Sequence, residues 1–265
     1  MPRPRHHPAA LDQLGRVDPA DLDATPTGRT TLVLIAHANS ETGTIQPITE
    51  LAATAHRHGA LFYTDAAQTV GKIPVDVQDL GVDLLTVVGH KMYAPKGIGA
   101  LYIRTGIPLR PVIFGGGQER GLRSGTENVA FIVALGAAAQ LAQEDLVATA
   151  VRLAHLRDLL HHELDAALPG RVHLNGDPDH RLPGTLNVSI SSVDSRALLA
   201  AIPDLAASTG SACHDGPSPV LAAMGLSARS AVRLSLGRST SEEEVKQAAR
   251  LLADQVLATP SMCKE

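Results

Sequence analysis

The sequence predicts an α/β fold, in which a mainly parallel sheet with covering helices is followed by a smaller α+β domain. In the first half of the chain, short apolar runs alternate with a helical pattern, which is typical of a sheet with helices packed on it. After about residue 130 the rhythm changes to shorter strands and shorter helices. We therefore expect a large domain at residues 1–129, and an interdomain helix with a small domain at residues 130–265.

The first predicted strand is residues 31–36 (TLVLIA), a continuous apolar run of the kind that is buried on both faces of a sheet. A helix follows it, because apolar residues recur at helical spacing from Ile48 to Ala55 and Gly59 can close the last turn. Further strands are expected at residues 60–64, 82–88 and 101–103.

The second half begins with residues 129–167, an Ala- and Leu-rich helical stretch that is too long for one ordinary helix without a kink. Strands are then expected at residues 172–174, 185–190 and 231–236. The last helix carries a capping signature, since Thr240 or Ser241 precedes Glu243 and Glu244.

Composition narrows the possible functions. The net charge of −4 does not favour nucleic acid or a membrane surface as a partner, and no apolar run reaches the roughly 18 residues of a membrane span. Two cysteines are too few for a structural zinc site or a disulfide framework, so we expect no metal and a reducing, cytoplasmic setting. The basic start of the chain lacks the apolar core of a secretory signal.

Three polar residues follow three predicted strands: Asn39, Asp65 and Lys91. Ligands of open α/β sheets lie beyond the carboxyl ends of the strands, where these side chains would meet. A lysine amine can form a Schiff base with a pyridine aldehyde, a carboxylate can keep the ring nitrogen protonated, and an amide can hydrogen-bond the ring hydroxyl. Each residue alone has a commoner explanation as a surface charge or a turn residue, but the set favours such a cofactor.

Four short runs carry a resemblance to a known family: residues 37–43 (HANSETG), 64–68 (TDAAQ), 89–91 (GHK) and 210–213 (GSAC). In this order they resemble the cysteine desulfurase and selenocysteine lyase family, within the class V aminotransferase group. The resemblance extends over nearly all of residues 17–257. It implies a pyridoxal-phosphate (PLP) transferase fold and the removal of sulfur or selenium from L-cysteine or L-selenocysteine, with L-alanine as the product.

The resemblance also implies roles for the cofactor-binding residues. Lys91 would bind the cofactor covalently and Asp65 would pair with the pyridine nitrogen. Gln68 and Asn39 would contact the ring hydroxyl side. His90, beside the lysine, belongs to the same cofactor-binding run.

Further positions match residues at the edges of the family's site. Arg233 matches the arginine that binds the substrate carboxylate, where Asn39 would also contribute, and a planar guanidinium suits bidentate carboxylate binding. Thr126 matches a residue that reaches the cofactor phosphate of a neighbouring subunit, which implies a homodimer. His7 aligns with the histidine that stacks on the pyridine ring.

Cys213 is the candidate nucleophile, since it lies in a loop of small residues and not among the apolar neighbours of a structural cysteine. An ordinary thiol pKa of about 8.5 leaves only a few per cent of it ionised near neutrality, and the neighbouring His214 could raise that fraction. The resemblance implies a persulfide on Cys213 and a sulfur-acceptor protein, as in iron–sulfur cluster assembly. Cys263, near the end of the chain, is expected to be a bystander.

The sequence departs from the family in two respects. Family members continue well beyond the N-terminal end of the match, with a Gly/Thr phosphate-binding loop there, so the large domain is expected to be incomplete. Val88 stands where some relatives have a phosphate-binding serine, and Ser40 replaces a frequent second asparagine. A non-catalytic remnant of the family, or another class V aminotransferase activity, therefore remain alternatives.

Overall fold

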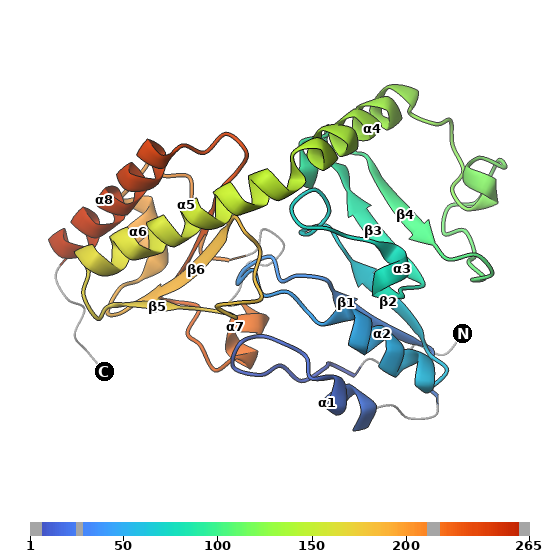
Figure 1. Cartoon of the computed structure of the whole chain (residues 1–265), viewed down its shortest axis with the longest axis horizontal. Coiled ribbons are helices and arrows are strands. Elements are labelled where there is room, and N and C mark those ends of the chain that lie inside the picture. Colours follow the sequence, from blue (N-terminus) through green and yellow to red (C-terminus); the bar gives the residue numbers. More distant parts are fainter. Residues whose placement is uncertain (1–6, 25–28, 211–217, 260–265) are drawn as a thin grey trace. The chain divides into compact units, whose positions relative to one another are not determined.

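The computed structural model describes residues 7–24, 29–210 and 218–259 (Figure 1). These residues form two compact units. The central unit contains residues 29–37 and 48–146. The terminal unit combines the N-terminal segment up to residue 24, residues 38–47, and the chain from residue 147 onward.

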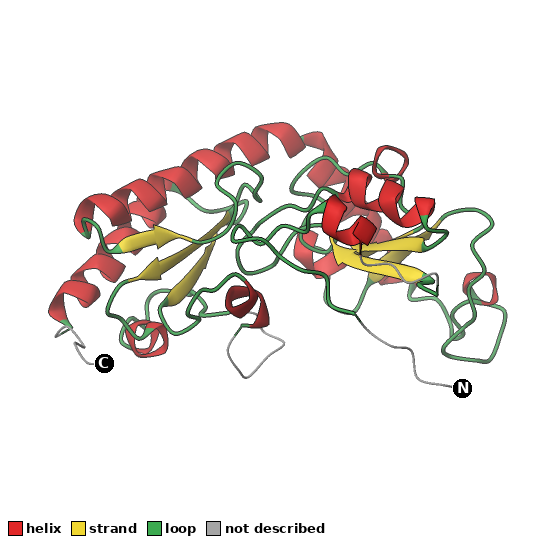
Figure 2. Ribbon diagram, turned by 90° about the horizontal axis from the view of Figure 1, so that it is seen from below, coloured by secondary structure: helices red, strands yellow, loops and turns green. Residues whose placement is uncertain are grey.

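The central unit is built on a four-stranded sheet with the order β1-β2-β3-β4. Figure 2 shows the strands in yellow and the helices in red. The strands of this sheet are β1 (Leu32–Ala36), β2 (Leu61–Asp65), β3 (Leu84–Val88) and β4 (Gly99–Ile103). The first three are parallel and β4 is antiparallel to β3. Helices α2 (Ile48–Arg57) and α3 (Val77–Leu80) make the crossover connections, as parallel neighbours require. The predicted α/β class with a mainly parallel sheet is confirmed.

The prediction that the first strand is buried on both faces is wrong. Burial alternates along β1: Val33 and Ile35 are buried, whereas Leu32 and Leu34 are 44% and 60% exposed. The buried face is the one on which α2 packs, through an apolar stripe that begins at Ile48. A continuous apolar run predicts a strand but does not state how many faces are covered, and here one face is left open to solvent.

The turn after β3 is the short helix η1 (Gly89–Met92). Gly89 is required there, because a Cβ atom would lie 2.7 Å from the carbonyl oxygen of Ile98. Tyr93 ends the turn in the left-handed conformation, with φ of 70°. Helix α4 (Val129–Glu144) packs against η1, and Gly71 allows the close approach of Ala142 and Met92. A second short helix, η2 (Glu119–Gly121), lies in the glycine-rich loop before α4.

The terminal unit contains an antiparallel sheet with the order β5-β6-β7. Its strands are β5 (Val172–Leu174), β6 (Thr185–Ile190) and β7 (Ala231–Ser235). Helices α5 (Leu146–Ala167), α6 (Ser195–Ala200) and α8 (Glu242–Ala258) contribute leucines, valines and alanines to one apolar core with this sheet. The short helices α1 (Pro19–Ala24) and α7 (Pro219–Ala223) complete the unit.

Two sequence predictions concern the helices. The long stretch at residues 129–167 is broken as expected, because α4 ends at Glu144 and α5 begins at Leu146. The capping signature is also confirmed: the Ser241 side chain accepts from the Glu244 N–H, and the Glu244 side chain accepts from the Ser241 N–H. The boundary between the two compact units in this part of the sequence falls after Leu146, at the break between α4 and α5. The predicted domain division at residues 129 and 130 stays a prediction.

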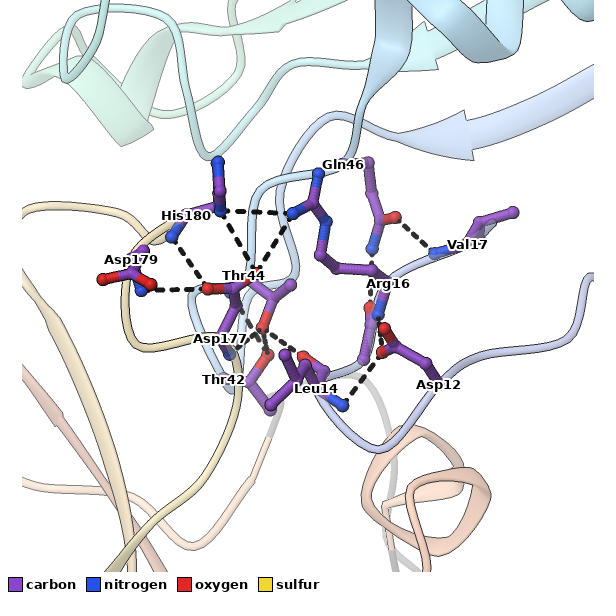
Figure 3. A network of polar contacts seen from close by, with 11 residues as sticks. Asp12, Leu14, Arg16, Val17, Thr42, Thr44, Gln46, Asp177, Asp179 and His180 are labelled. Atoms are coloured by element: carbon purple, nitrogen blue, oxygen red, sulfur yellow. Dashed lines mark hydrogen bonds and ion pairs between the residues drawn. The ribbon is translucent and has the colours of Figure 1, made fainter. Parts of the chain in front are cut away.

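The N-terminal segment is held in the terminal unit by a polar network (Figure 3). The Gln46 side chain accepts from the N–H of Val17 at 2.8 Å and donates to the carbonyl of Gly15 at 2.7 Å. The Thr44 hydroxyl accepts from the N–H of Asp177 at 3.1 Å, and the Asp177 carboxylate pairs with Arg16 at 3.2 Å. Residues 38–47 are thereby fixed to segments on either side in the sequence.

Among the described residues no single helix is long and apolar enough to cross a membrane, although α4 and α5 taken together would pass on length and composition alone. The described part of the chain also contains no group of three or more histidine, cysteine or acidic side chains arranged to hold a metal ion.

Candidate active site

Asp65 ends the parallel strand β2, and its carboxylate is only partly engaged. One oxygen, Oδ1, accepts from the N–H of Ala67 at 2.8 Å, which closes a local turn. No contact of the other oxygen with a described residue is found. The Asp65 backbone carbonyl accepts from the N–H of His37, one residue beyond the end of β1. The half-buried side chain is therefore fixed on one side and open on the other.

Lys91 lies on η1, directly after the neighbouring parallel strand β3, with His90 beside it. Both side chains are exposed, and the Lys91 ammonium has no hydrogen bond or ion pair with a described residue. Because β2 and β3 are parallel, Asp65 and Lys91 leave the same edge of the sheet, as predicted from the sequence. They carry opposite charges at this edge and do not pair with each other.

The other predicted cofactor-binding residues of the central unit are Gln68 and Thr126. Gln68 is half-buried, and its side-chain oxygen accepts from the Lys72 ammonium at 3.1 Å, which leaves the amide NH₂ as a donor. Thr126 is exposed in the loop before α4. His7, in the terminal unit, is also exposed. The roles of these residues stay predictions.

Asn39 belongs to the terminal unit, where it organises the turn that follows it. Its side-chain oxygen accepts from the N–H groups of Glu41 and Thr42, both at 2.8 Å, and from the Thr42 hydroxyl at 3.2 Å. These three contacts occupy the oxygen. The amide NH₂ is left to act on a ligand, so Asn39 can serve there only as a donor.

Arg233 lies in the middle of β7, and its guanidinium is half-buried. One terminal nitrogen, Nη1, donates to the carbonyl of Ser40 at 3.1 Å, while the buried Nε has no partner. Burial lowers the pKa of Arg233 from its usual value, and the charge of Glu41 opposes that shift. The Arg233 backbone forms a bridge with Ser208, in the segment that precedes Cys213 in the sequence.

Cys213, the predicted nucleophile, and its neighbour His214 lie outside the described residues, as does Cys263. The described chain before them ends in a turn in which the Ser208 hydroxyl donates to the carbonyl of Gly210 at 2.7 Å. The sequence prediction for Cys213 therefore stays a prediction.

Sequence reasoning missed two buried polar residues in the run 37–43. Glu41 is 4% exposed, and its Oε2 atom has no partner. His37 is 5% exposed with an unpartnered Nδ1 atom, and burial lowers the pKa of its imidazole from 6.5 to about 4. Neither position shows hydrophobic periodicity, so the only available signal was their place in a motif.

Comparison with known proteins accounts for this arrangement. The chain belongs to the aminotransferase class-V family, whose model matches residues 5–248. It is 48% identical over 254 residues to the cysteine desulfurase IscS of Anaeromyxobacter sp. (strain Fw109-5), covering 93% of this chain and 63% of that protein. These matches confirm the resemblance to the cysteine desulfurases, and the family's cofactor is PLP.

Two solved structures are similar as well. A NifS-like protein superposes with a TM-score of 0.86 at 36% identity, covering 94% of this chain and 67% of that one. A structure described as SspA in complex with cysteine gives a TM-score of 0.68 at 34% identity, with 86% and 65% covered. The chain spans about three fifths of the length of the curated relatives it matches.

The residues present fit the ring of PLP. An unpaired lysine amine and a half-used carboxylate leave the same sheet edge, and these are the groups that hold an aromatic aldehyde and its ring nitrogen. For the cofactor phosphate, the resemblance assigns one described residue, Thr126, whose side chain is exposed.

Proposed function

We propose that this chain is a PLP-dependent cysteine desulfurase, which removes sulfur from L-cysteine and releases L-alanine. Three findings support the proposal: the family match, the curated relatives named as cysteine desulfurases, and a solved relative described as a complex with cysteine. A non-catalytic remnant, or a class V activity without sulfur, has no comparable support.

One observation carries the proposal. Asp65 and Lys91 leave neighbouring parallel strands at one edge, yet they do not neutralise each other. In an ordinary surface turn, opposite charges so placed would be free to pair with each other or with near neighbours. Two unpaired groups at one sheet edge suit a ligand that binds both of them. The Lys91 amine would act as the nucleophile, and the Asp65 carboxylate would act as the counter-charge.

In this function Lys91 holds the cofactor and then acts as the base on the substrate α-carbon. When bound, PLP supplies a ring that stores the electron pair released there. Asp65 keeps the ring nitrogen protonated, and the Asn39 amide donates a hydrogen bond to the ring hydroxyl side. Arg233 orients the substrate through its carboxylate, so that the α-proton faces the Lys91 amine.

The sulfur step falls to Cys213. Its thiolate attacks the substrate sulfur, forming an S–S bond while the bond between sulfur and the substrate β-carbon breaks. The electron pair of that bond goes to the β-carbon, which takes a proton to become the methyl group of alanine. The transferred sulfur stays on Cys213 as a persulfide, ready for a thiol acceptor.

The first test is the visible absorption of the purified protein with PLP, together with alanine release from L-cysteine. We expect a cofactor band in the parent that is lost in Lys91→Ala, and alanine release that falls by at least about a thousandfold. Lys96→Ala is the matched control, because Lys96 is an exposed lysine on the same turn region. No band in a folded parent would contradict the proposal.

A second arm concerns the thiol. Cys213→Ala should keep the cofactor band but lose alanine release and protein-bound persulfide, whereas Cys263→Ala should keep all three. Equal activity in Cys213→Ala and the parent would instead favour class V chemistry that does not need a protein thiol.

We further infer that L-selenocysteine is accepted by the same residues, because the Cys213 thiolate can attack selenium as it attacks sulfur, with the electron pair of the broken bond going to the β-carbon in both cases. Comparing alanine release from the two amino acids separates a desulfurase from a selenocysteine lyase. The proposed persulfide requires a reduced thiol, which supports a cytoplasmic location and a sulfur-acceptor protein, such as one used in iron–sulfur cluster assembly.

We infer a homodimer as the working form. Exposed apolar side chains near Thr126 support it, including Val112 and Phe114, which are 91% and 79% exposed. Exposed patches of this kind often mark protein interfaces. Light scattering of the purified chain at several concentrations tests the assignment, and a monomer at all of them would contradict it.

A further inference from the structure

Glu41 is a buried carboxylate that the proposed chemistry does not use. Its backbone is fixed at both ends, since its N–H donates to the Asn39 side chain and its carbonyl accepts from the Asn187 amide at 3.0 Å. The side chain is 4% exposed, and the Oε2 atom is buried without a partner. A charged oxygen in this condition costs free energy unless a nearby positive charge compensates it.

The nearby positive charge is Arg233. Asn187 and Arg233 are cross-strand partners on β6 and β7, and together they hold two consecutive carbonyl groups. Asn187 binds the carbonyl of Glu41, and Arg233 binds the carbonyl of Ser40. The two contacts bind the adjacent residues Ser40 and Glu41 to neighbouring strands of the same sheet, and the charge of Glu41 acts on the guanidinium.

The two charges nevertheless make no direct ion pair. Arg233 Nε and Glu41 Oε2 are both buried and unpartnered, although the Glu41 charge acts on the guanidinium. The Glu41 carboxylate therefore acts electrostatically on Arg233 but does not accept a hydrogen bond from its Nε atom. The Nε donor of Arg233 is left without an acceptor in the described chain, and a carboxylate is a suitable acceptor for a guanidinium.

We propose that Glu41 is a specificity-determining residue that acts as a resident counter-charge of Arg233 and weakens the binding of every carboxylate there. The inference rests on the proposed function, in which Arg233 binds the substrate carboxylate. A resident negative charge weakens the binding of the carboxylate, so that the product alanine dissociates readily. It also disfavours ligands with two negative charges more strongly than amino acids with one.

The test is calorimetric binding of 3-mercaptopropionate, a carboxylate without an amine, to the protein with PLP and without it. Glu41→Gln should bind it at least about tenfold more tightly than the parent, because the neutral amide removes a negative charge that opposes a bound carboxylate. Cysteamine, which lacks the carboxylate, should bind equally to both proteins. In activity assays the variant should show a lower KM for cysteine and stronger inhibition by alanine.

The sign of the change separates this role from a structural one. If Glu41 only supported the local fold, Glu41→Gln would bind the carboxylate more weakly. Asp177→Asn is the matched control, because Asp177 is another buried carboxylate of the terminal unit and does not act on Arg233. In an Arg233→Ala background, Glu41→Gln should change nothing.

Unchanged or weaker binding by Glu41→Gln, with normal binding by the parent, would overturn this inference alone. Binding by neither protein would overturn the assignment of Arg233 as the carboxylate site, and this inference with it. Tighter binding by Glu41→Gln in a protein that releases no alanine would contradict the proposed function and leave the inference standing.

Discussion

The two compact units bury their apolar residues to very different extents. In the terminal unit, leucines of α5 and α8 close over a three-stranded sheet and form one continuous core. In the central unit, one sheet face is covered by α2 while Leu34 on the other is 60% exposed, and most of the large exposed apolar side chains of the described chain belong to this unit. The unit that carries Lys91 and Asp65 is therefore the less completely buried one.

The two units also differ in how firmly they hold the residues for which we propose a function. The substrate-side residues Asn39, Glu41 and Arg233 are buried or half-buried and fixed by several hydrogen bonds. On the cofactor side, Lys91 is exposed and unpaired, and Asp65 is held at one oxygen. Arg233, for which we propose binding of the substrate carboxylate, is thus held in place by the fold, whereas Lys91 and Asp65 keep unengaged groups that can bind a ligand.

The largest expected contrast comes from one substitution made in both units. Leu164→Ala, at a fully buried position of α5, should lower the free energy of unfolding by about 2–5 kcal/mol through loss of burial and a cavity. Leu34→Ala, on the open face of β1, should change it by less than about 0.5 kcal/mol. Urea unfolding followed by circular dichroism measures both.

A large loss of stability in Leu34→Ala would break the comparison. It would mean that another polypeptide surface covers the open face in solution. Repeating the unfolding at several protein concentrations then shows whether that surface comes from a second copy of the chain, since only in that case does the stability depend on concentration.

A smaller contrast concerns pH. Burial lowers the pKa of His37 from 6.5 to about 4, so between these values the unfolded chain binds a proton here that the folded chain does not. Stability should therefore fall as the pH falls from 6.5 to 4, by about 3 kcal/mol in total from this group. Unfolding in urea across this range, compared with His37→Gln, measures the contribution.

His161 of the terminal unit is the control for that measurement. Burial also lowers the pKa of its imidazole, but the side chain lies nearer the surface and has carboxylates close by that oppose the shift. His161→Gln should therefore flatten the pH dependence less than His37→Gln does. An equal effect of the two would show that the central unit does not bury His37 as deeply as the structure indicates.

The smallest expected contrast lies at the helix caps. Ser241→Ala removes half of a reciprocal capping box on α8 and should cost about 1 kcal/mol. Asn128→Ala removes a contact of the same length, 3.2 Å to the N–H of Phe131 at the start of α4, that is not part of a reciprocal capping box, and it should cost less. Thermal unfolding shows which of the two variants loses more stability. A larger loss in Asn128→Ala would show that α4 depends on its cap more than on packing against η1.

Sequence patterns with strong local causes were sufficient for much of the fold. The stripe from Ile48 to Ala55 predicted α2, and the serine and glutamate before the last helix predicted its capping box. The strand at residues 31–36 was also found, but its open face was not foreseen, because apolar composition records what a strand can bury and not what is present to cover it.

The candidate site divides in the same way. Asp65 and Lys91 could be placed from the sequence because parallel strands deliver their ends to one edge. Glu41 could not, since its burial results from the cross-strand pair Asn187 and Arg233, which is far away in the sequence and brought close only by the fold. The role of His7 rests on the resemblance alone, whereas that of Cys213 rests on the resemblance and on its loop of small residues.

The polar network around Thr44 and Gln46 has a consequence for the order of events on the ribosome. Asp177 is translated about 160 residues after its partner Arg16, which at roughly 5–20 residues per second is a wait of about 10–30 s. The central unit, nearly continuous in sequence, is complete in the meantime. The contact between Arg16 and Asp177 therefore forms only after the middle of the protein has had time to fold, and a chaperone has that interval in which to bind the N-terminal segment.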